Sequence, residues 1–206
     1  MDDLRDITQW RITSKNKLSL ATKDNDLGLI VITDKDVKEN GIADYFSVSA
    51  SKKTKNNKFV FGNYLLNFGA GLIFASPFSY INSINNFSLD LLKSISEVNR
   101  VYENKSLFGF GLSHSISNFA IHAFLSSSLH DASVENNTVK RIYYYTTYTD
   151  SLSRERRSKL RENLMGLRMT YASFNQNILI GTTIYHNYYD KKSSLLTRKI
   201  LFTVQT

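Results

Sequence analysis

A histidine, a serine and an asparagine lie close together in one short stretch, where they could cooperate in nucleophilic catalysis. His122, Ser126 and Asn118 are separated by even numbers of residues, which places them on one face of an extended strand. A histidine in such a set can act as the general base for a serine hydroxyl. Nothing in the flanking sequence marks Ser126 as an activated nucleophile, so we expect ordinary polar residues on that face.

The remaining candidate residues do not have the spacing of metal or phosphate sites. His114, His130 and His186 lack a zinc-ligand pattern such as HExxH. The acidic stretch "TDKDVKENGIAD" (33–44) lacks the spacing of a calcium-binding loop, and "FGAGLIF" (68–74) lacks the lysine of a phosphate-binding loop. We therefore expect no metal, no cofactor and no enzymatic activity.

Composition restricts the class of protein further. The 206 residues include 13 Phe and 12 Tyr but only one Trp and one Pro, and such aromatic content favours β-strands. The absence of cysteine excludes disulfides and thiolate metal sites. The net charge is +8, but acidic residues interrupt the densest basic cluster, "SRERRSKLRE" (153–162). We expect a solvated loop there rather than a dedicated polyanion site.

The sequence indicates neither a transmembrane helix nor a signal peptide. The sequence has no run of about 18 apolar residues, so we expect no transmembrane helix. The first ten residues, "MDDLRDITQW", are acidic and lack the apolar run of a signal peptide. The chain is therefore predicted to be either cytosolic or an internal piece of a longer protein.

Runs of alternating character, separated by polar turns, predict an antiparallel all-β fold. In "LFGFGLSH", for example, Phe108, Phe110 and Leu112 share one face and Gly109, Gly111 and Ser113 the other. The strands are expected at 7–15, 17–23, 27–34, 43–53, 57–68, 105–116, 118–128, 139–149, 163–174, 176–188 and 195–205. The segment 79–104 breaks this rhythm, and the spacing of Leu89, Leu92, Ile95 and Val98 predicts a loop with a short helix.

The alternation is compatible with two architectures. In a soluble β-sandwich the apolar faces pack against each other, whereas in a transmembrane β-barrel they face lipid and the polar faces line the interior. Several runs reach the ~9–11 residues that a membrane strand needs. Tyrosines also gather near strand ends, as in "RIYYYTTYTD" (141–150), like an interfacial aromatic girdle. These features favour an up-and-down transmembrane barrel or partial barrel, and the sandwich stays open as the alternative.

Glycine is concentrated in one predicted strand, "GNYLLNFGAGLIFASPF" (62–78), although glycine weakens a regular strand. We expect the glycines to permit a bend or bulge and a close approach of the following loop. The expected structural motif comprises Gly62, Tyr64, Phe68, Gly69, Gly71, Leu72 and Pro77.

Six segments in sequence order resemble a family of Gram-negative outer-membrane β-barrel proteins whose longer members carry N-terminal helix-hairpin-helix repeats. The segments are "LGLIVITDKD" (27–36), "DYFSVSAS" (44–51), "GNYLLNFGAGLIFASPF" (62–78), "VYENKSLFGFGLS" (101–113), "FLSSSLHDAS" (124–133) and "YTDSLSRERRSKLRENLMGLRMTY" (148–171). Asn63 and Ala70 stand where the family pattern has Asp and Gln. The resemblance covers about residues 18–188.

This resemblance implies that the whole chain, residues 1–206, is one barrel segment of a longer protein in the cell outer membrane. The implied function is non-enzymatic, in envelope transport or assembly, with the lipid bilayer and other envelope proteins as partners. Nucleic acid would be bound only through a helix-hairpin-helix segment that this sequence does not contain. Two alternatives stay open: a soluble β-rich binding module, and the barrel part of a DNA-handling envelope protein.

Overall fold

A computed structural model shows an all-β protein, as expected, and describes residues 14–24, 26–35, 43, 45–68, 95–101, 106–143, 151–173, 179–192 and 198–205. The strands are β1 (Ser14–Ala21), β2 (Leu27–Lys35), β3 (Tyr45–Lys53), β4 (Asn57–Leu66), β5 (Ile95–Glu97), β6 (Leu107–Ile116), β7 (Phe119–Glu135), β8 (Thr138–Tyr143), β9 (Leu160–Ala172), β10 (Leu179–Tyr189) and β11 (Arg198–Gln205). A short helix, α2, spans Ser151–Arg156. Within the described ranges no helix is long and apolar enough to cross a membrane.

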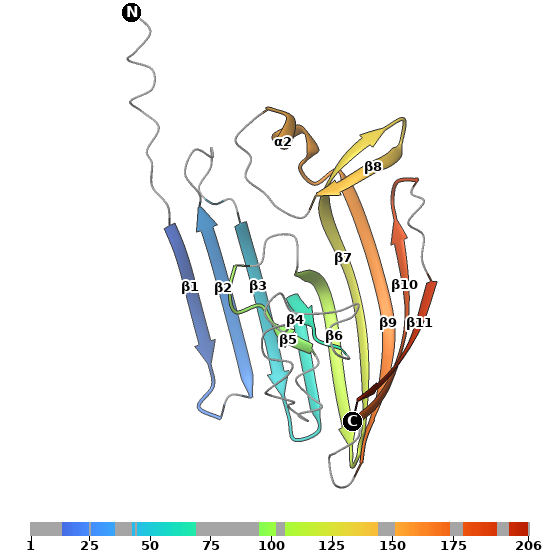
Figure 1. Cartoon of the computed structure of the whole chain (residues 1–206). Coiled ribbons are helices and arrows are strands. Elements are labelled where there is room, and N and C mark those ends of the chain that lie inside the picture. The colour runs from blue at the N-terminus through green and yellow to red at the C-terminus, as the bar shows by residue number, and fades with distance from the viewer. Residues whose placement is uncertain are drawn as a thin grey trace, which may run out of the picture.

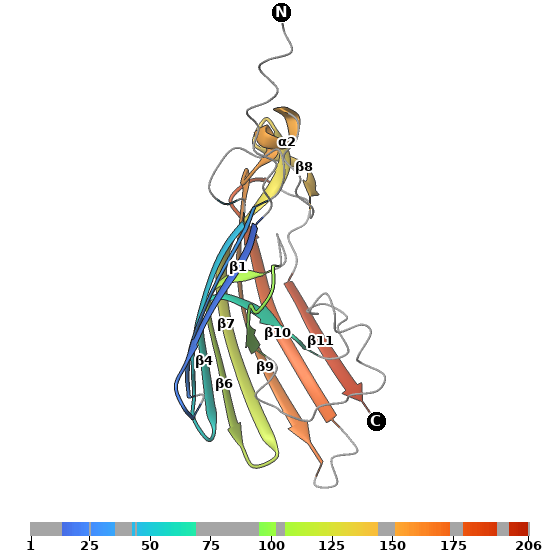
Figure 2. The same cartoon turned by 90° about the vertical axis from the view of Figure 1, so that its left-hand side faces the viewer.

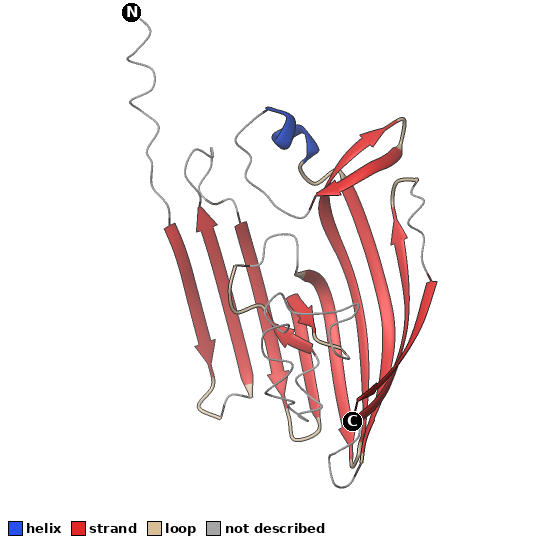
Figure 3. Ribbon diagram, in the orientation of Figure 1, coloured by secondary structure: helices blue, strands red, loops and turns tan. Residues whose placement is uncertain are grey.

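The strands form an antiparallel sheet in the order β1-β2-β3-β4-β6-β7-β9-β10-β11, with β5 paired to β4 and β8 paired to β7 (Figures 1 and 3). The sheet is curved, and β5 lies on its concave side (Figure 2). Among the described residues β1 and β11 each pair with one neighbour, so the sheet is open. The described residues therefore form one open, curved sheet and not a closed barrel.

The two faces of the sheet differ in an unusual way, because the outer, convex face is apolar and exposed while the concave face is buried and carries polar as well as apolar side chains. On β7 the exposed side chains Phe119, Ile121, Leu125 and Leu129 alternate with buried Ala120, His122, Phe124, Ser126, Ser128 and His130. Exposed Met165, Leu167 and Met169 on β9 alternate with buried Leu164, Arg168 and Thr170. The alternation predicted from the sequence is therefore confirmed, and the exposed side is the apolar one.

The core lies on the concave side of the sheet. One cluster contains Val60, Tyr64, Leu66, Phe68, Ile95, Phe124, Leu164 and Tyr185, and a smaller one contains Ile32, Tyr45, Leu65 and Val98. Members of both clusters come from the end of β4 and from the segment around β5. These segments therefore fill the hollow of the curved sheet.

Three expected elements differ from those observed. The break expected between strands at 7–15 and 17–23 is absent, because β1 runs continuously from Ser14 to Ala21; residues 7–13 lie outside the described part. The predicted short helix does not reach Ile95, because residues 95–97 form β5 and pair with Leu66, Leu65 and Tyr64; residues 79–94 lie outside the described part. Of the strand expected at 139–149, the structure describes residues 139–143, which belong to β8 and pair with β7 outside the main strand order; residues 144–149 lie outside the described part. The preceding strand β7 continues to Glu135 and turns back through Asn136 and Asn137, both with positive φ, into β8. Two such residues form the tight turn that closes a two-residue hairpin.

Candidate functional site

The concave face becomes enclosed where β4 bends at Gly62. This residue has a φ of 90° and pairs with both Ser49 of β3 and Gly109 of β6. A Cβ atom on Gly62 would overlap the backbone oxygen of Val48, and one on Gly109 would overlap that of Leu125. The missing side chains let β4 approach β3 closely and let β6 approach β7, and β4 turns into the hollow beyond this point.

Polar contacts hold the bent end of β4 in place. The Asn63 side chain accepts a hydrogen bond from the Val48 amide (3.1 Å) and donates one to the Ser106 hydroxyl (3.2 Å). The amide thus acts as acceptor and donor at once, and links β4 to β3 and to the residue that precedes β6. The Tyr64 hydroxyl donates to the Leu125 carbonyl oxygen (2.9 Å), which joins the bent end of β4 to β7, the second strand along the sheet.

An ion pair attaches the short strand β5 to β4 of the curved sheet. The ammonium of Lys58 lies 3.1 Å from the Glu97 carboxylate, and both side chains are mostly buried. The Ser49 hydroxyl oxygen accepts a hydrogen bond from the amide of Val98, just beyond β5 (3.2 Å). Burial alone would raise the pKa of Glu97, but Lys58 and several hydrogen bonds offset that effect and hold the pKa below its usual value of 4.5.

A depressed pKa makes part of the stability depend on pH. The ionised Glu97 stabilises the fold above pH 4.5, and this contribution is lost as the pH falls through the lower pKa of the folded state. We expect Glu97→Gln to lower the urea midpoint of the detergent-solubilised protein at pH 7, and the difference from the unmodified chain to shrink below pH 4.5. A difference that stayed constant down to pH 3 would contradict the ion pair.

Several deeply buried polar residues of the concave face form a cluster under Phe68. Arg168, 3% exposed, donates to the hydroxyls of Thr183 (2.8 Å) and Thr170 (3.2 Å). Its guanidinium lies 5.3 Å from the centre of the Phe68 ring, and His122 lies 5.7 Å from the same ring. Among the described residues no carboxylate forms an ion pair with Arg168. The bent end of β4 thus covers a polar cluster that carries a positive charge.

The histidine singled out in the sequence has a different partner from the one considered. His122 Nδ1 lies 2.9 Å from the hydroxyl of Ser113 on β6, and both residues are fully buried. Ser126 is on the same face of β7 but makes no hydrogen bond to His122, and Asn118 lies in the turn before β7. The buried His122–Ser113 contact joins two neighbouring strands and has no access for a substrate.

The structure describes three of the seven residues of the predicted glycine motif. Gly62, Tyr64 and Phe68 come together at the bend and in the core below it. Gly69, Gly71, Leu72 and Pro77 lie outside the described residues. No group of three or more possible metal ligands occurs among the residues that the structure describes.

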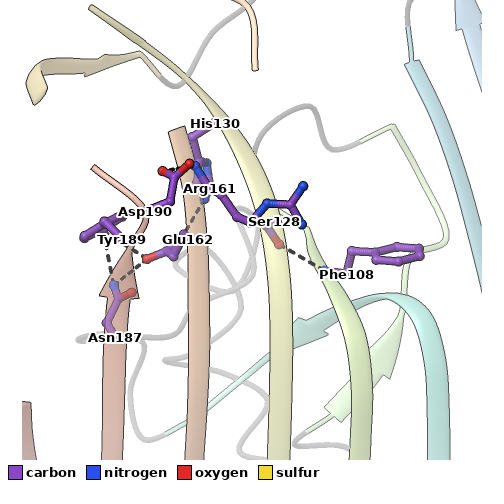
Figure 4. A network of polar contacts seen from close by, with 8 residues as sticks. All are labelled: Phe108, Ser128, His130, Arg161, Glu162, Asn187, Tyr189 and Asp190. Carbon is purple, nitrogen blue, oxygen red and sulfur yellow. Dashed lines mark hydrogen bonds and ion pairs between the residues drawn. The ribbon is translucent and has the colours of Figure 1, made fainter. Parts of the chain in front are cut away.

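A second polar network lies at the end of the sheet nearest α2 (Figure 4). The Glu162 carboxylate is 2.7 Å from His130 Nε2, accepts from Tyr189 (3.0 Å) and also accepts from the Asn187 amide. Nearby, Asp190 Oδ1 accepts a hydrogen bond from the backbone amide of Arg161 (2.9 Å), which joins the start of β9 to the residue after β10. This network ties β7, β9 and β10 together at one rim of the concave face.

The sequence did not indicate this rim network, because its members come from three strands. The only local signal is the even spacing of Asn187 and Tyr189, which places both on the inner face of β10. Their shared partner Glu162 is 25 residues or more away and becomes apparent only from the register of β9 with β10.

Comparisons with known proteins add no family to this geometry. No protein-family model, curated protein or solved structure matches the chain. The resemblance to outer-membrane barrel proteins therefore remains a prediction from the six sequence segments.

Proposed function

We propose that this chain forms the wall of a transmembrane β-barrel in an outer membrane, with a non-enzymatic role in envelope transport or assembly. The observation that carries the proposal is the reversed polarity of the sheet. Large apolar side chains are exposed along the convex face from β1 to β10, while serines, threonines, histidines and an arginine are buried on the concave face. Water disfavours an exposed apolar face of this extent, whereas the hydrocarbon of a bilayer accepts it.

The length of the apolar stretch agrees with the thickness of a membrane. On β7 the exposed apolar residues run from Phe119 to Leu129, which is about 33 Å along a strand at ~3.3 Å per residue. A strand tilted by ~40° would cover about 25 Å of height over that distance, which is the usual height of the apolar band in such barrels.

The filling of the concave side supports a structural or assembly role over an open channel. Tyr64, Leu66 and Phe68 from β4 and Ile95 from β5 pack against Phe124, Leu164 and Tyr185 of the wall. An apolar cluster in this place would obstruct the free passage of water along the described part of the wall. The open edges at β1 and β11 would need pairing in a bilayer, since unpaired backbone groups are costly there.

The orientation of the two faces can be tested with a pair of tryptophan variants on one strand. Leu18 and Lys17 are neighbouring exposed residues on β1, and their register partners are Val31 and Ile32. Leu18 shares the outer face with exposed Leu20, while Lys17 points to the concave side. In a Trp10→Phe background, we expect brominated lipids to quench the fluorescence of Leu18→Trp strongly and that of Lys17→Trp weakly.

Vesicles containing the refolded protein would provide the measurement, and an aqueous quencher such as iodide should show the opposite order. Equal quenching of both variants by brominated lipid, or none of either, would contradict a bilayer-facing outer surface.

A further inference from the structure

Folding brings three segments together beyond one end of the sheet. They are the hairpin at 131–143, the segment 151–162 with α2, and the turn at 190–192, which together we call the basic head (Figure 1). The amide of Val139 donates to the Lys192 oxygen (2.9 Å), and that of Lys192 donates to the Asn137 oxygen (3.0 Å). Ser158 donates to the Asp131 side chain (2.8 Å). Backbone contacts of this kind fix the three segments relative to one another.

The basic head concentrates positive charge. Its three segments contain nine Lys and Arg residues and five Asp and Glu residues. Asp131 and Glu162 are turned inward, toward Ser158 and the rim network respectively. The cations are mostly exposed: Lys140, Arg141, Arg154, Arg157, Lys159, Arg161 and Lys192 all lie at the surface. The surface of the head is therefore more positive than its sequence composition implies.

Two of the arginines are held in position by an aromatic ring. The guanidinium of Arg156, from α2, lies 4.9 Å from the centre of the Tyr143 ring, and that of Arg141, from β8, lies 5.4 Å from it. Such stacking orients a guanidinium while leaving its edge donors able to bind an anion. The head thus presents ordered donors from two separate segments.

The position of these cations relative to the apolar face indicates what they meet. Arg161 is the register partner of Leu129, the last exposed apolar residue of the outer face on β7. Tyr188, half-exposed on the outer face of β10, is the register partner of Asn163, which lies two residues from Arg161 on β9. Positive charge therefore begins where the apolar band ends, with no intervening neutral layer. In a bilayer that is the level of the lipid phosphates.

We propose that the basic head binds the phosphate groups of anionic lipids in the leaflet at that end of the barrel. The proposal rests on the membrane role proposed above. It adds a binding partner, anionic lipid, and names the end of the sheet at which that lipid is bound. It reverses the expectation that the basic cluster at 153–162 is only a solvated loop. That expectation treated one segment alone, whereas Lys140, Arg141, Lys191 and Lys192 reach the cluster only through the fold.

The test uses the full chain refolded into phosphatidylcholine bilayers that contain a trace of spin-labelled lipid. Electron paramagnetic resonance separates lipid that contacts the protein, whose motion is restricted, from bulk lipid. We expect labelled phosphatidylglycerol to be enriched several-fold over labelled phosphatidylcholine in the restricted fraction. The enrichment should weaken as salt is raised from low to high concentration, because the exposed charges become screened.

A triple variant and its matched control assign the enrichment to the head. Lys140→Gln, Lys159→Gln and Lys192→Gln together remove one exposed cation from each segment. At low salt each cation near an anionic surface changes lipid affinity by roughly 5-fold, so the triple variant should lose the enrichment. The corresponding Lys→Arg triple keeps the charge and should retain it.

The outcomes distinguish failure of this inference from failure of the proposed function. A restricted fraction with equal amounts of the two labelled lipids would overturn lipid recognition but leave the membrane role intact. No restricted fraction with either label would overturn both. Lipid recognition would also be overturned if the unmodified chain showed no lipid preference but bound single-stranded DNA in a way that the Gln triple abolished.

Discussion

Leu167→Arg is expected to lower the free energy of unfolding in a lipid bilayer by about 2–4 kcal/mol, the range known for arginine at the midplane of a barrel's lipid face. Leu167 is 59% exposed near the middle of the outer face of β9, between Met165 and Met169. In water, an exposed leucine at such a place could be replaced at almost no cost. In hydrocarbon the guanidinium has neither water nor a partner, so the penalty reports directly on what surrounds the sheet.

Leu152→Arg provides the matched control, because Leu152 is 56% exposed on α2, in the basic head. The same change there should alter stability by less than ~0.5 kcal/mol, as is usual for surface substitutions. Reversible urea unfolding in vesicles gives both values. If the two variants were equally stable, the convex face would have to be wetted by water, and the proposed membrane role would fail.

The wall of the sheet could be predicted because its signal is local. Along each long strand, one side chain in two belongs to a face, so alternation such as Phe108, Phe110 and Leu112 against Gly109 and Gly111 needs no knowledge of distant segments. The sequence could not show which face would be exposed. Both architectures considered produce the same alternation, and the burial of residues such as His122 and Arg168 became apparent only from the structure.

The inner segment could not be predicted, because its signal is ambiguous. Ile95 and Val98 are three residues apart, which resembles one face of a helix. In the structure they belong to different core clusters, Ile95 with Phe124 and Val98 with Ile32. Ile95 lies in the short strand β5 and Val98 lies just beyond it, so their spacing does not reflect a helix. The pairing of β5 with Leu65 and its neighbours joins residues about 30 positions apart in the chain. Long-range pairing overrode the local pattern here.

The polar cluster illustrates the same limit on a smaller scale. The sequence grouped His122 with Ser126 because both lie on one face of one strand. Register places Ser113 and Arg168 directly opposite His122 on the two neighbouring strands, nearer than any residue two positions along β7. Neighbours across a sheet are fixed by register, and register depends on the turns and on every other strand.

Gly62→Ala is expected to destabilise the fold by about 2–5 kcal/mol, since a left-handed backbone costs an L-residue ~1–2 kcal/mol and steric overlap adds a further ~1–3 kcal/mol. Gly62 has a φ of 90°, and its new Cβ would meet the backbone oxygen of Val48. That oxygen belongs to the middle of β3, whose pairing with β2 and β4 prevents it from moving aside.

Gly28→Ala separates this effect from the general consequence of adding a methyl group to a strand. Its φ is not positive, and the new Cβ would lie 3.0 Å from the hydroxyl of Ser51, a side-chain atom that can rotate away. We expect a change of less than ~1 kcal/mol. Urea unfolding in detergent micelles measures both variants, and protease accessibility shows whether the segment beyond Gly62 has left the hollow. Phe68 reaches the polar cluster, and Tyr64 reaches the Leu125 carbonyl oxygen, only if β4 bends at Gly62. An alanine there that left stability and accessibility unchanged would therefore mean that the bend does not hold the inner segment.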